Sequence, residues 1–145
     1  MSRTAPTTAA PGIAAIAATA DPVDRFLDAV TAAAIPRCDA WADEVVLDAT
    51  VPNWRFTRRG AAAVRDEYRN WFAHAGRLDG LRRMAVAGGE VVEYTVSWEE
   101  DGVPHAAHHV HILDVVDGRI ARDTVMCGGR WPASLLAEME AASRG

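Results

Sequence analysis

The chain has 145 residues, half of them hydrophobic, and a net charge of −5. This length and composition predict a compact domain with a sizeable core. Because no segment carries a basic stripe, nucleic acid is not expected as a partner. All 15 basic residues are arginine, which excludes a mechanism in which a lysine forms a Schiff base. No apolar run approaches the roughly 18 residues that span a bilayer, so no membrane partner is expected.

Residues 1–20, "MSRTAPTTAAPGIAAIAATA", are rich in alanine, threonine and proline. The "ATA" before Asp21 imitates a signal-peptide cleavage site, but the leucine-rich core of a signal peptide is missing. The two cysteines, Cys38 and Cys127, do not make a disulfide framework. We therefore expect a disordered tail over 1–20, a single domain over 21–145 and a cytoplasmic location.

Two helices are predicted at the start of the domain. Asp21 can cap the first of them and Pro22 suits its first turn, and apolar residues then recur at helical spacing over 21–35. A short second helix is predicted over 36–44, after a proline interrupts the first pattern.

Strands dominate the second half of the chain. The sequences "EDGV" and "VDGR" contain Asp-Gly, a strong signal for a β-hairpin. Helices followed by a strand meander predict an α+β fold, with the helices on one face of an antiparallel sheet. The other predicted elements are strands over 45–51 and 53–59, a helix over 61–75, strands over 81–87, 90–100, 105–116 and 119–127, and a helix over 132–142.

This order of elements resembles the nuclear transport factor 2-like superfamily, in its branch of SnoaL-like proteins and ketosteroid isomerases. The matching pieces are "WADEVVLDATV", "RRGAAAVRDEYRNWF" and "VVDGRIARDTV", and the resemblance covers residues 22–131. It implies a cone-shaped α+β fold, in which a curved antiparallel sheet wraps around the N-terminal helices and leaves a deep, largely apolar pocket. It also implies a homodimer that pairs the outer sheet faces. This fold hosts many activities and many pure binders, so the resemblance specifies structure better than function.

The catalytic residues of ketosteroid isomerases are not retained in this chain. By the resemblance, Phe26 stands in place of their oxyanion-hole tyrosine, and Ala49 in place of their base, with Asp48 on the opposite face. His111 stands in place of their second oxyanion-hole acid. The usual steroid isomerase mechanism is therefore not expected. SnoaL-like cyclases and limonene epoxide hydrolases carry an acid on the last strand, and Asp123 lies close to that position.

The stretch "HAAHHVHILDVVDGRIARD", residues 105–123, brings histidines close to Asp123 in one hairpin. A two-residue Asp-Gly turn would place His111 opposite Thr124, whereas a three-residue loop with a glycine bulge would place it opposite Asp123. We favour the bulged loop, because it matches the pocket-facing positions of the superfamily. One face of the hairpin is then predicted to carry His109, His111, Asp123, Val125 and Cys127. The other is predicted to carry Val110, Ile112, Ile120, Arg122, Thr124 and Met126.

The first functional hypothesis is acid–base catalysis by a His111–Asp123 pair. The carboxylate would fix the tautomer of the imidazole, which would then act as a general base near neutral pH. Isomerisation, cyclisation, dehydration or hydrolysis of a small, largely apolar carbonyl or epoxide compound would suit this pair, without a cofactor. Asp48 or Tyr68 could supply a further polar group. The residues predicted to bind the ligand are Phe26, Trp54, Tyr68, His109, Val125 and Cys127.

Two alternatives remain open. A buried His–Asp pair can simply satisfy itself, so a non-catalytic small-molecule binding protein is the second hypothesis, with Trp54 and Trp131 placed to hold a flat ligand. The third is a metal site, since His109 and His111 share a strand face and Asp123 or Cys127 could be a further donor. No Cys-x-x-Cys or His-Glu-x-x-His motif accompanies these histidines. We therefore predict no metal.

Overall fold

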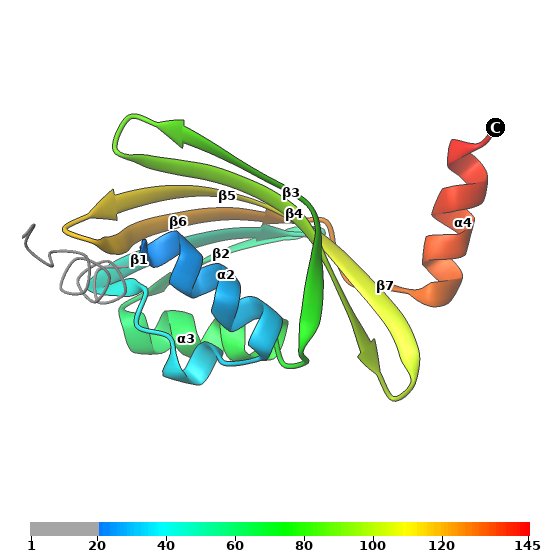
Figure 1. The fold of residues 1–145 in the computed structure, drawn as a ribbon, viewed down its shortest axis with the longest axis horizontal. Coiled ribbons are helices and arrows are strands. Elements are labelled where there is room, and N and C mark those ends of the chain that lie inside the picture. Colours follow the sequence, from blue (N-terminus) through cyan, green and yellow to red (C-terminus); the bar gives the residue numbers. More distant parts are fainter. Residues whose placement is uncertain (1–20) are drawn as a thin grey trace, which may run out of the picture.

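The structure, a computed structural model, describes residues 21–145, so the tail predicted over 1–20 lies outside the described residues. Two helices cover one side of a curved sheet, and a third stands apart from it near the C-terminus (Figure 1). This is the predicted α+β architecture. The helical elements are α2 (Pro22–Ala32), the short 3₁₀ turn η1 (Ile35–Arg37), α3 (Ala61–Trp71) and α4 (Ala133–Ser143). The strands are β1 (Trp41–Val51), β2 (Trp54–Arg59), β3 (Gly76–Val86), β4 (Gly89–Glu100), β5 (Val103–Val116), β6 (Arg119–Cys127) and β7 (Trp131–Pro132).

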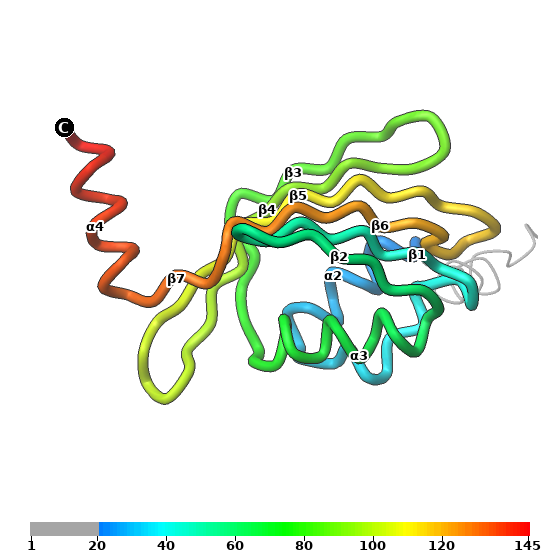
Figure 2. The backbone as a smooth tube through the Cα atoms, turned by 180° about the vertical axis from the view of Figure 1, so that it is seen from behind, coloured from blue at the N-terminus to red at the C-terminus, as the bar shows by residue number. Residues whose placement is uncertain are grey.

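The strands form one sheet with the order β2-β1-β6-β5-β4-β3, and β7 pairs with β5 outside this path. Neighbouring strands run antiparallel except β1 and β6, which are parallel, so the sheet is mixed rather than wholly antiparallel as expected. Seen from behind, the sheet bends around α2 and α3 (Figure 2). Its concave side therefore holds the core.

The helix α2 begins as predicted. The Asp21 side chain accepts a hydrogen bond from the backbone N–H of Val23 at 2.7 Å, and a proline stands in the first turn. The helix ends at Ala32, because Ala33 takes a left-handed conformation with φ 53° and its N–H turns back to Ala29. Phe26 on its apolar face packs into the core, where it is 1% exposed.

The short second helix predicted over 36–44 is wrong. Only one 3₁₀ turn, Ile35–Arg37, is present, and β1 begins at Trp41. The Trp41 side chain is 1% exposed beneath the first helix, and its backbone pairs with Ile120 of β6. Burial of this large side chain on the sheet outweighs the weak local preference for a helix.

The strand β3 starts at Gly76, five residues before the predicted start at Leu81. Its first part is polar, but it continues the ladder along β4, where Gly76 pairs with Trp98. A register shift between Asp79 and Arg82 interrupts the ladder. As an edge strand it needs no apolar alternation, which is why its composition did not reveal it.

Aromatic side chains fill the space between the helices and the sheet. Tyr68 of α3 and Phe72, the residue that follows this helix, lie 5.6 and 6.1 Å from Phe26 of α2, measured between ring centroids. Burying side chains of this size stabilises the fold by about 1.5–3 kcal/mol each. By contrast, no residue of α4 is buried. None of the helices in the part of the chain that the structure describes is long and apolar enough to cross a membrane.

Candidate functional site

The turn between β5 and β6 has two residues. Val116 pairs with Arg119, and the intervening Asp117 and Gly118 have φ angles of 51° and 74°. Positive φ at both central positions is typical of the type I′ hairpin turn. The three-residue bulged loop that we favoured is therefore wrong.

A β-bulge further along β6 nevertheless places His111 and Asp123 on the same face of the hairpin, as the bulged loop predicted. Ile120 pairs with Val115, but Arg122 pairs with Asp114, so Ala121 is an extra residue in β6. Beyond the bulge, each residue of β6 therefore points to the opposite face of the sheet from the one that the two-residue turn alone would give. Ile120, predicted on the outer face, is fully buried because it precedes the bulge.

His111 and Asp123 consequently point to the same side of the sheet, although they are not paired. His111 pairs with Val125, and Asp123 pairs with Leu113, which makes the two polar residues diagonal neighbours. His111 Nδ1 lies 2.9 Å from Asp123 Oδ1, and both side chains are 0% exposed.

Tyr68 of α3 completes the surroundings of this carboxylate. Its hydroxyl donates a hydrogen bond of 2.6 Å to Asp123 Oδ2, so each carboxylate oxygen has a partner. Burial raises the pKa of the Tyr68 hydroxyl well above its usual value, and the Asp123 charge adds to this effect. The phenol therefore remains a donor across the physiological pH range.

The hydrogen-bond chain continues from His111 towards β4. His111 Nε2 lies 2.8 Å from the hydroxyl of Tyr94, and that hydroxyl lies 3.2 Å from His109 Nδ1. Burial raises the pKa of Tyr94 well above its usual value, with the Asp123 charge as a second cause. We call the unbroken chain Tyr68–Asp123–His111–Tyr94–His109 the polar relay.

A pocket of about 470 Å³ opens at the His109 end of the relay. Its apolar walls include Trp71 from the end of α3 and Trp98 from β4, and Glu67, Asn70 and Arg130 add polar atoms. The remaining lining residues are Val51, Pro52, Ala107, His109, Cys127 and Gly129. The relay thus connects an enclosed carboxylate to a pocket that a small molecule can enter.

The imidazole of His109 is the member of the relay that reaches the pocket. Its Nε2 has no hydrogen-bond partner among residues 21–145. The buried unpartnered side-chain atoms of that region are the indole nitrogens of Trp41 and Trp98, so Nε2 of His109 keeps some accessible surface, although the residue as a whole is only 2% exposed. Because His109 lines the pocket, we take this surface to face the pocket. Burial holds the pKa of His109 well below 6.5, and His111 and His108 lower it further.

The structure brings only some of the predicted ligand-binding residues to the pocket. His109 and Cys127 line it. Phe26, Tyr68 and Val125 are buried behind its wall with the His111–Asp123 pair, and none of them lines the pocket.

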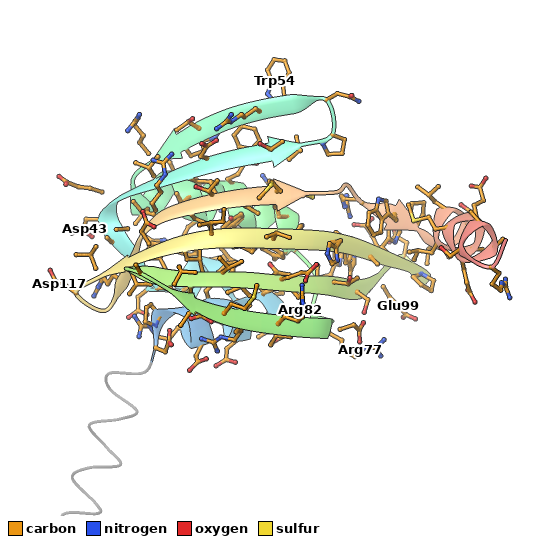
Figure 3. The ribbon with its side chains drawn as sticks, turned by 90° about the horizontal axis from the view of Figure 1, so that it is seen from above. Asp43, Trp54, Arg77, Arg82, Glu99 and Asp117 are labelled. Carbon is orange, nitrogen blue, oxygen red and sulfur yellow. The ribbon has the colours of Figure 1, made fainter. Side chains whose placement is uncertain are left out.

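Two other predicted positions lie away from the pocket altogether. Trp54 is 68% exposed on β2 and projects from the edge of the sheet (Figure 3). Asp48 occupies the outer face of the sheet, where Arg55 binds both of its oxygens at 3.0 and 2.8 Å. Only Tyr68, of the two polar groups considered for assistance, contacts the pair.

Tyr94 is the member of the relay that sequence reasoning missed. It belongs to the alternation Val92, Tyr94, Val96, Trp98, all buried on the inner face of β4. It pairs with His109 across the sheet, so the hydroxyl can reach both histidines. The period-two pattern of "VVEYTVSW" was a usable signal for this face.

The geometry gives no support to the metal hypothesis. In residues 21–145 no group of three or more His, Cys, Asp or Glu side chains is arranged to hold a metal ion. Both nitrogens of His111 and Nδ1 of His109 are engaged in the relay. Cys127 lies beside the pocket, where its sulfur accepts a hydrogen bond from the Gly129 N–H at 3.3 Å, and burial raises its thiol pKa.

Neither a protein-family model nor a curated protein sequence matches the chain. Solved structures do match it. A candidate isomerase from Bacillus subtilis is 15% identical with a TM-score of 0.61, covering 74% of this chain and 84% of its own. An NTF2-like protein of unknown function from Mesorhizobium loti is 22% identical with a TM-score of 0.58, covering 77% and 91%. An LEH-like epoxide hydrolase from Mycobacterium tuberculosis is 18% identical with a TM-score of 0.58, covering 73% and 79%.

These similarities and the observed arrangement agree on one architecture. Proteins described as NTF2-like match this chain in fold, with TM-scores of 0.57 and 0.58 for two of them. The chain has the nuclear transport factor 2-like fold.

Proposed function

We propose that this protein catalyses a cofactor-independent acid–base reaction on a small, largely apolar molecule bound in the 470 Å³ pocket. The observation that carries the proposal is the polar relay, which joins the enclosed His111–Asp123 pair to His109 in the pocket wall. A solvent-excluded chain of ionisable groups that ends at a ligand-sized cavity is an arrangement suited to general acid–base catalysis.

The pocket supports the choice of ligand. Its volume falls within the range of roughly 300–1,000 Å³ that is usual for small-molecule sites. The flat side chains of Trp71 and Trp98 favour an apolar, planar body, while Asn70 and Arg130 can bind one polar group. A carbonyl compound or an epoxide has this combination of features.

The reaction types that fit are isomerisation, cyclisation, dehydration and hydrolysis, because each needs one proton removed and another supplied. Solved structures of similar fold include a candidate isomerase, a candidate polyketide cyclase and an epoxide hydrolase. At these levels of identity they support the fold alone, so the proposed reaction rests on the residues of the site.

Proton exchange on a probe ketone tests the proposal. Acetophenone is incubated with the protein in D₂O, and the loss of its methyl protons is followed by NMR, with cyclohexene oxide as a probe for hydrolysis. We expect the wild type to accelerate at least one reaction over buffer, and Asp123→Asn to lose most of the acceleration. Binding is measured on the same samples by saturation-transfer NMR.

The alternative is a non-catalytic small-molecule binding protein, and one observation favours it. His111 and Asp123 are fully enclosed and do not line the pocket, as expected of a pair that satisfies its own hydrogen bonds. A wild type that binds acetophenone, leaves both reactions at the buffer rate and keeps its affinity after Asp123→Asn would establish this alternative.

A further inference from the structure

We propose that His109 Nε2 is the atom that exchanges a proton with the bound ligand, and that Tyr94 relays this proton to and from His111. The inference deepens the proposed acid–base function and rests on it for its catalytic use. The relay of protons itself can be tested in the protein without any ligand.

One arrangement of protons makes His109 a base. The Asp123 carboxylate accepts hydrogen bonds from the Tyr68 hydroxyl and from His111 Nδ1–H. A neutral His111 then has a lone pair on Nε2, which accepts a hydrogen bond from the Tyr94 hydroxyl. The Tyr94 oxygen in turn accepts a hydrogen bond from the Nδ1–H of His109. The Nε2 atom of His109, which faces the pocket, is then unprotonated.

The second arrangement differs by one proton. A proton taken from the ligand bonds to His109 Nε2, and the Nδ1–H proton of His109 passes to the Tyr94 oxygen. The original hydroxyl proton of Tyr94 passes to His111 Nε2. The ligand has lost one proton, His111 has become an imidazolium, and His109 is again neutral but with its proton on Nε2.

Charge favours His111 as the final position of the proton. The imidazolium would lie 2.9 Å from the Asp123 carboxylate, whereas no ion pair involving His109 is found among residues 21–145. Burial lowers the pKa of His109, so a lasting positive charge there is unfavourable. Tyr94 remains a neutral hydroxyl before and after the transfer, because its raised pKa opposes the loss of its proton unless another proton replaces it.

The other groups packed against the relay do not compete for the proton. Cys127 pairs with His109 in the β5–β6 ladder, and burial raises the pKa of its thiol, so the thiol stays neutral. Glu67 on α3 binds Arg58 at 3.0 Å and the Trp71 indole at 3.0 Å. His108, next in sequence, turns to the outer face, where it meets Glu93 at 2.9 Å. From α2, His111 meets only the apolar ring of Phe26.

The relay restricts the class of reaction. The proton stored on His111 can return along the same path, so His109 Nε2 first removes a proton from the ligand and then delivers one. Removal and return therefore use the same face of the ligand. A carbonyl compound with an acidic C–H, which forms an enolate and is reprotonated at another carbon, meets this requirement.

The test is a pH titration of the protein labelled with ¹⁵N-histidine, in which the imidazole nitrogens report protonation and tautomer. In the wild type, we expect His111 to become an imidazolium on acidification. At the same midpoint, His109 should change from the Nδ1–H to the Nε2–H tautomer without gaining charge. In Tyr94→Phe this switch of His109 should no longer follow His111. His108→Gln, on the outer face of the same strand, should keep the switch.

Two results would overturn the relay in the wild type alone, whether or not Tyr94→Phe folds. Either His109 itself becomes an imidazolium at the first titration step, or it keeps one tautomer while His111 gains charge. Acceleration of proton exchange on acetophenone without the coupled switch would contradict the relay and leave the proposed function standing. A coupled switch without any acceleration of either probe reaction would contradict the proposed function alone.

Discussion

His111 Nδ1 and Asp123 Oδ1 lie 2.9 Å apart even though the two residues are not opposite each other on β5 and β6. The extra residue Ala121 sets this relationship, because it turns the rest of β6 so that Asp123 faces inward. Without the bulge, a one-residue change of register would carry Asp123 to the outer face.

Removing the carboxylate should cost substantial stability. Asp123→Ala leaves His111 Nδ1–H and the Tyr68 hydroxyl without their acceptor inside the core. Each buried donor left without an acceptor costs about 1–3 kcal/mol. The free energy of unfolding in urea measures the loss. Asp114→Ala, at an exposed position of the same hairpin, should stay within about 0.5 kcal/mol of the wild type. A loss below about 1 kcal/mol for Asp123→Ala would contradict the account.

Two adjacent histidines provide a matched pair for the proposed function. His109 lines the pocket, whereas His108 faces outward and contacts Thr95 at 2.8 Å and Glu93 at 2.9 Å. His109→Gln should lower the rate of proton exchange on acetophenone by about 10²–10⁴-fold, the usual contribution of a general base. His108→Gln should leave the rate unchanged. Equal losses in the two variants would point to a folding defect instead of a catalytic role.

The strand alternation of the last hairpin predicted which side chains share the inner face. His109, His111, Asp123 and Val125 are buried together as expected. The residue pairing was out of reach, since an Asp-Gly turn fits several loop lengths and Ala121 has no feature that marks a bulge. The predicted set of inward-facing side chains was right because the bulge at Ala121 turns Asp123 and Val125 to the same face as His109 and His111.

The connection of the pair to the pocket could not be predicted from one hairpin. It depends on Tyr94, which comes from another strand and reaches both histidines only through the β4–β5 register. For Trp54, by contrast, the sequence predicted a contact with the pocket that the structure does not have. An aromatic residue at a strand end suggested a pocket rim, but β2 is one of the two edge strands and leaves that side chain 68% exposed.

Stability should depend on Asp48 in a pH-dependent way. Hydrogen bonds from Arg55 lower the pKa of this carboxyl group below its ordinary value of 3.8. The ionised form therefore stabilises the fold above pH 3.8, and this contribution is lost as the pH falls through the lower folded-state pKa. Asp48→Asn should be less stable than the wild type at pH 7, and the difference should shrink in acid. Urea unfolding across this range measures it, with the exposed Asp28→Asn as the control.

The homodimer stays a prediction, and the outer sheet face is where we propose that two copies meet. Met84 and Ile112 both flank Val91 across neighbouring strands, and Met84 and Ile112 are 45% and 41% exposed. An apolar row of this kind on a sheet favours pairing with a like surface. Ile112→Arg should convert a dimer to a monomer in size-exclusion chromatography with light scattering. Val103→Arg, at the far end of β5, should not.

Filling the pocket should block binding and leave the fold intact. Ala107 is 3% exposed and lines the pocket, so Ala107→Leu would place its added carbons in the 470 Å³ space. A side chain that enters an existing cavity avoids most of the roughly 1–3 kcal/mol cost of overpacking. Acetophenone binding, measured by saturation-transfer NMR, should weaken at least about tenfold, which corresponds to 1.4 kcal/mol. The exposed Ala62→Leu on α3 is the control.

Unchanged binding in Ala107→Leu would place the ligand elsewhere. A second hollow of about 530 Å³ lies between the β4–β5 hairpin and α4, where His105 and Leu136 line it. No member of the polar relay lines that hollow. Binding there would separate the ligand from His109, so the acid–base function would lose the contact on which it depends. Ala107→Leu therefore tests the position of the ligand and the proposed chemistry together.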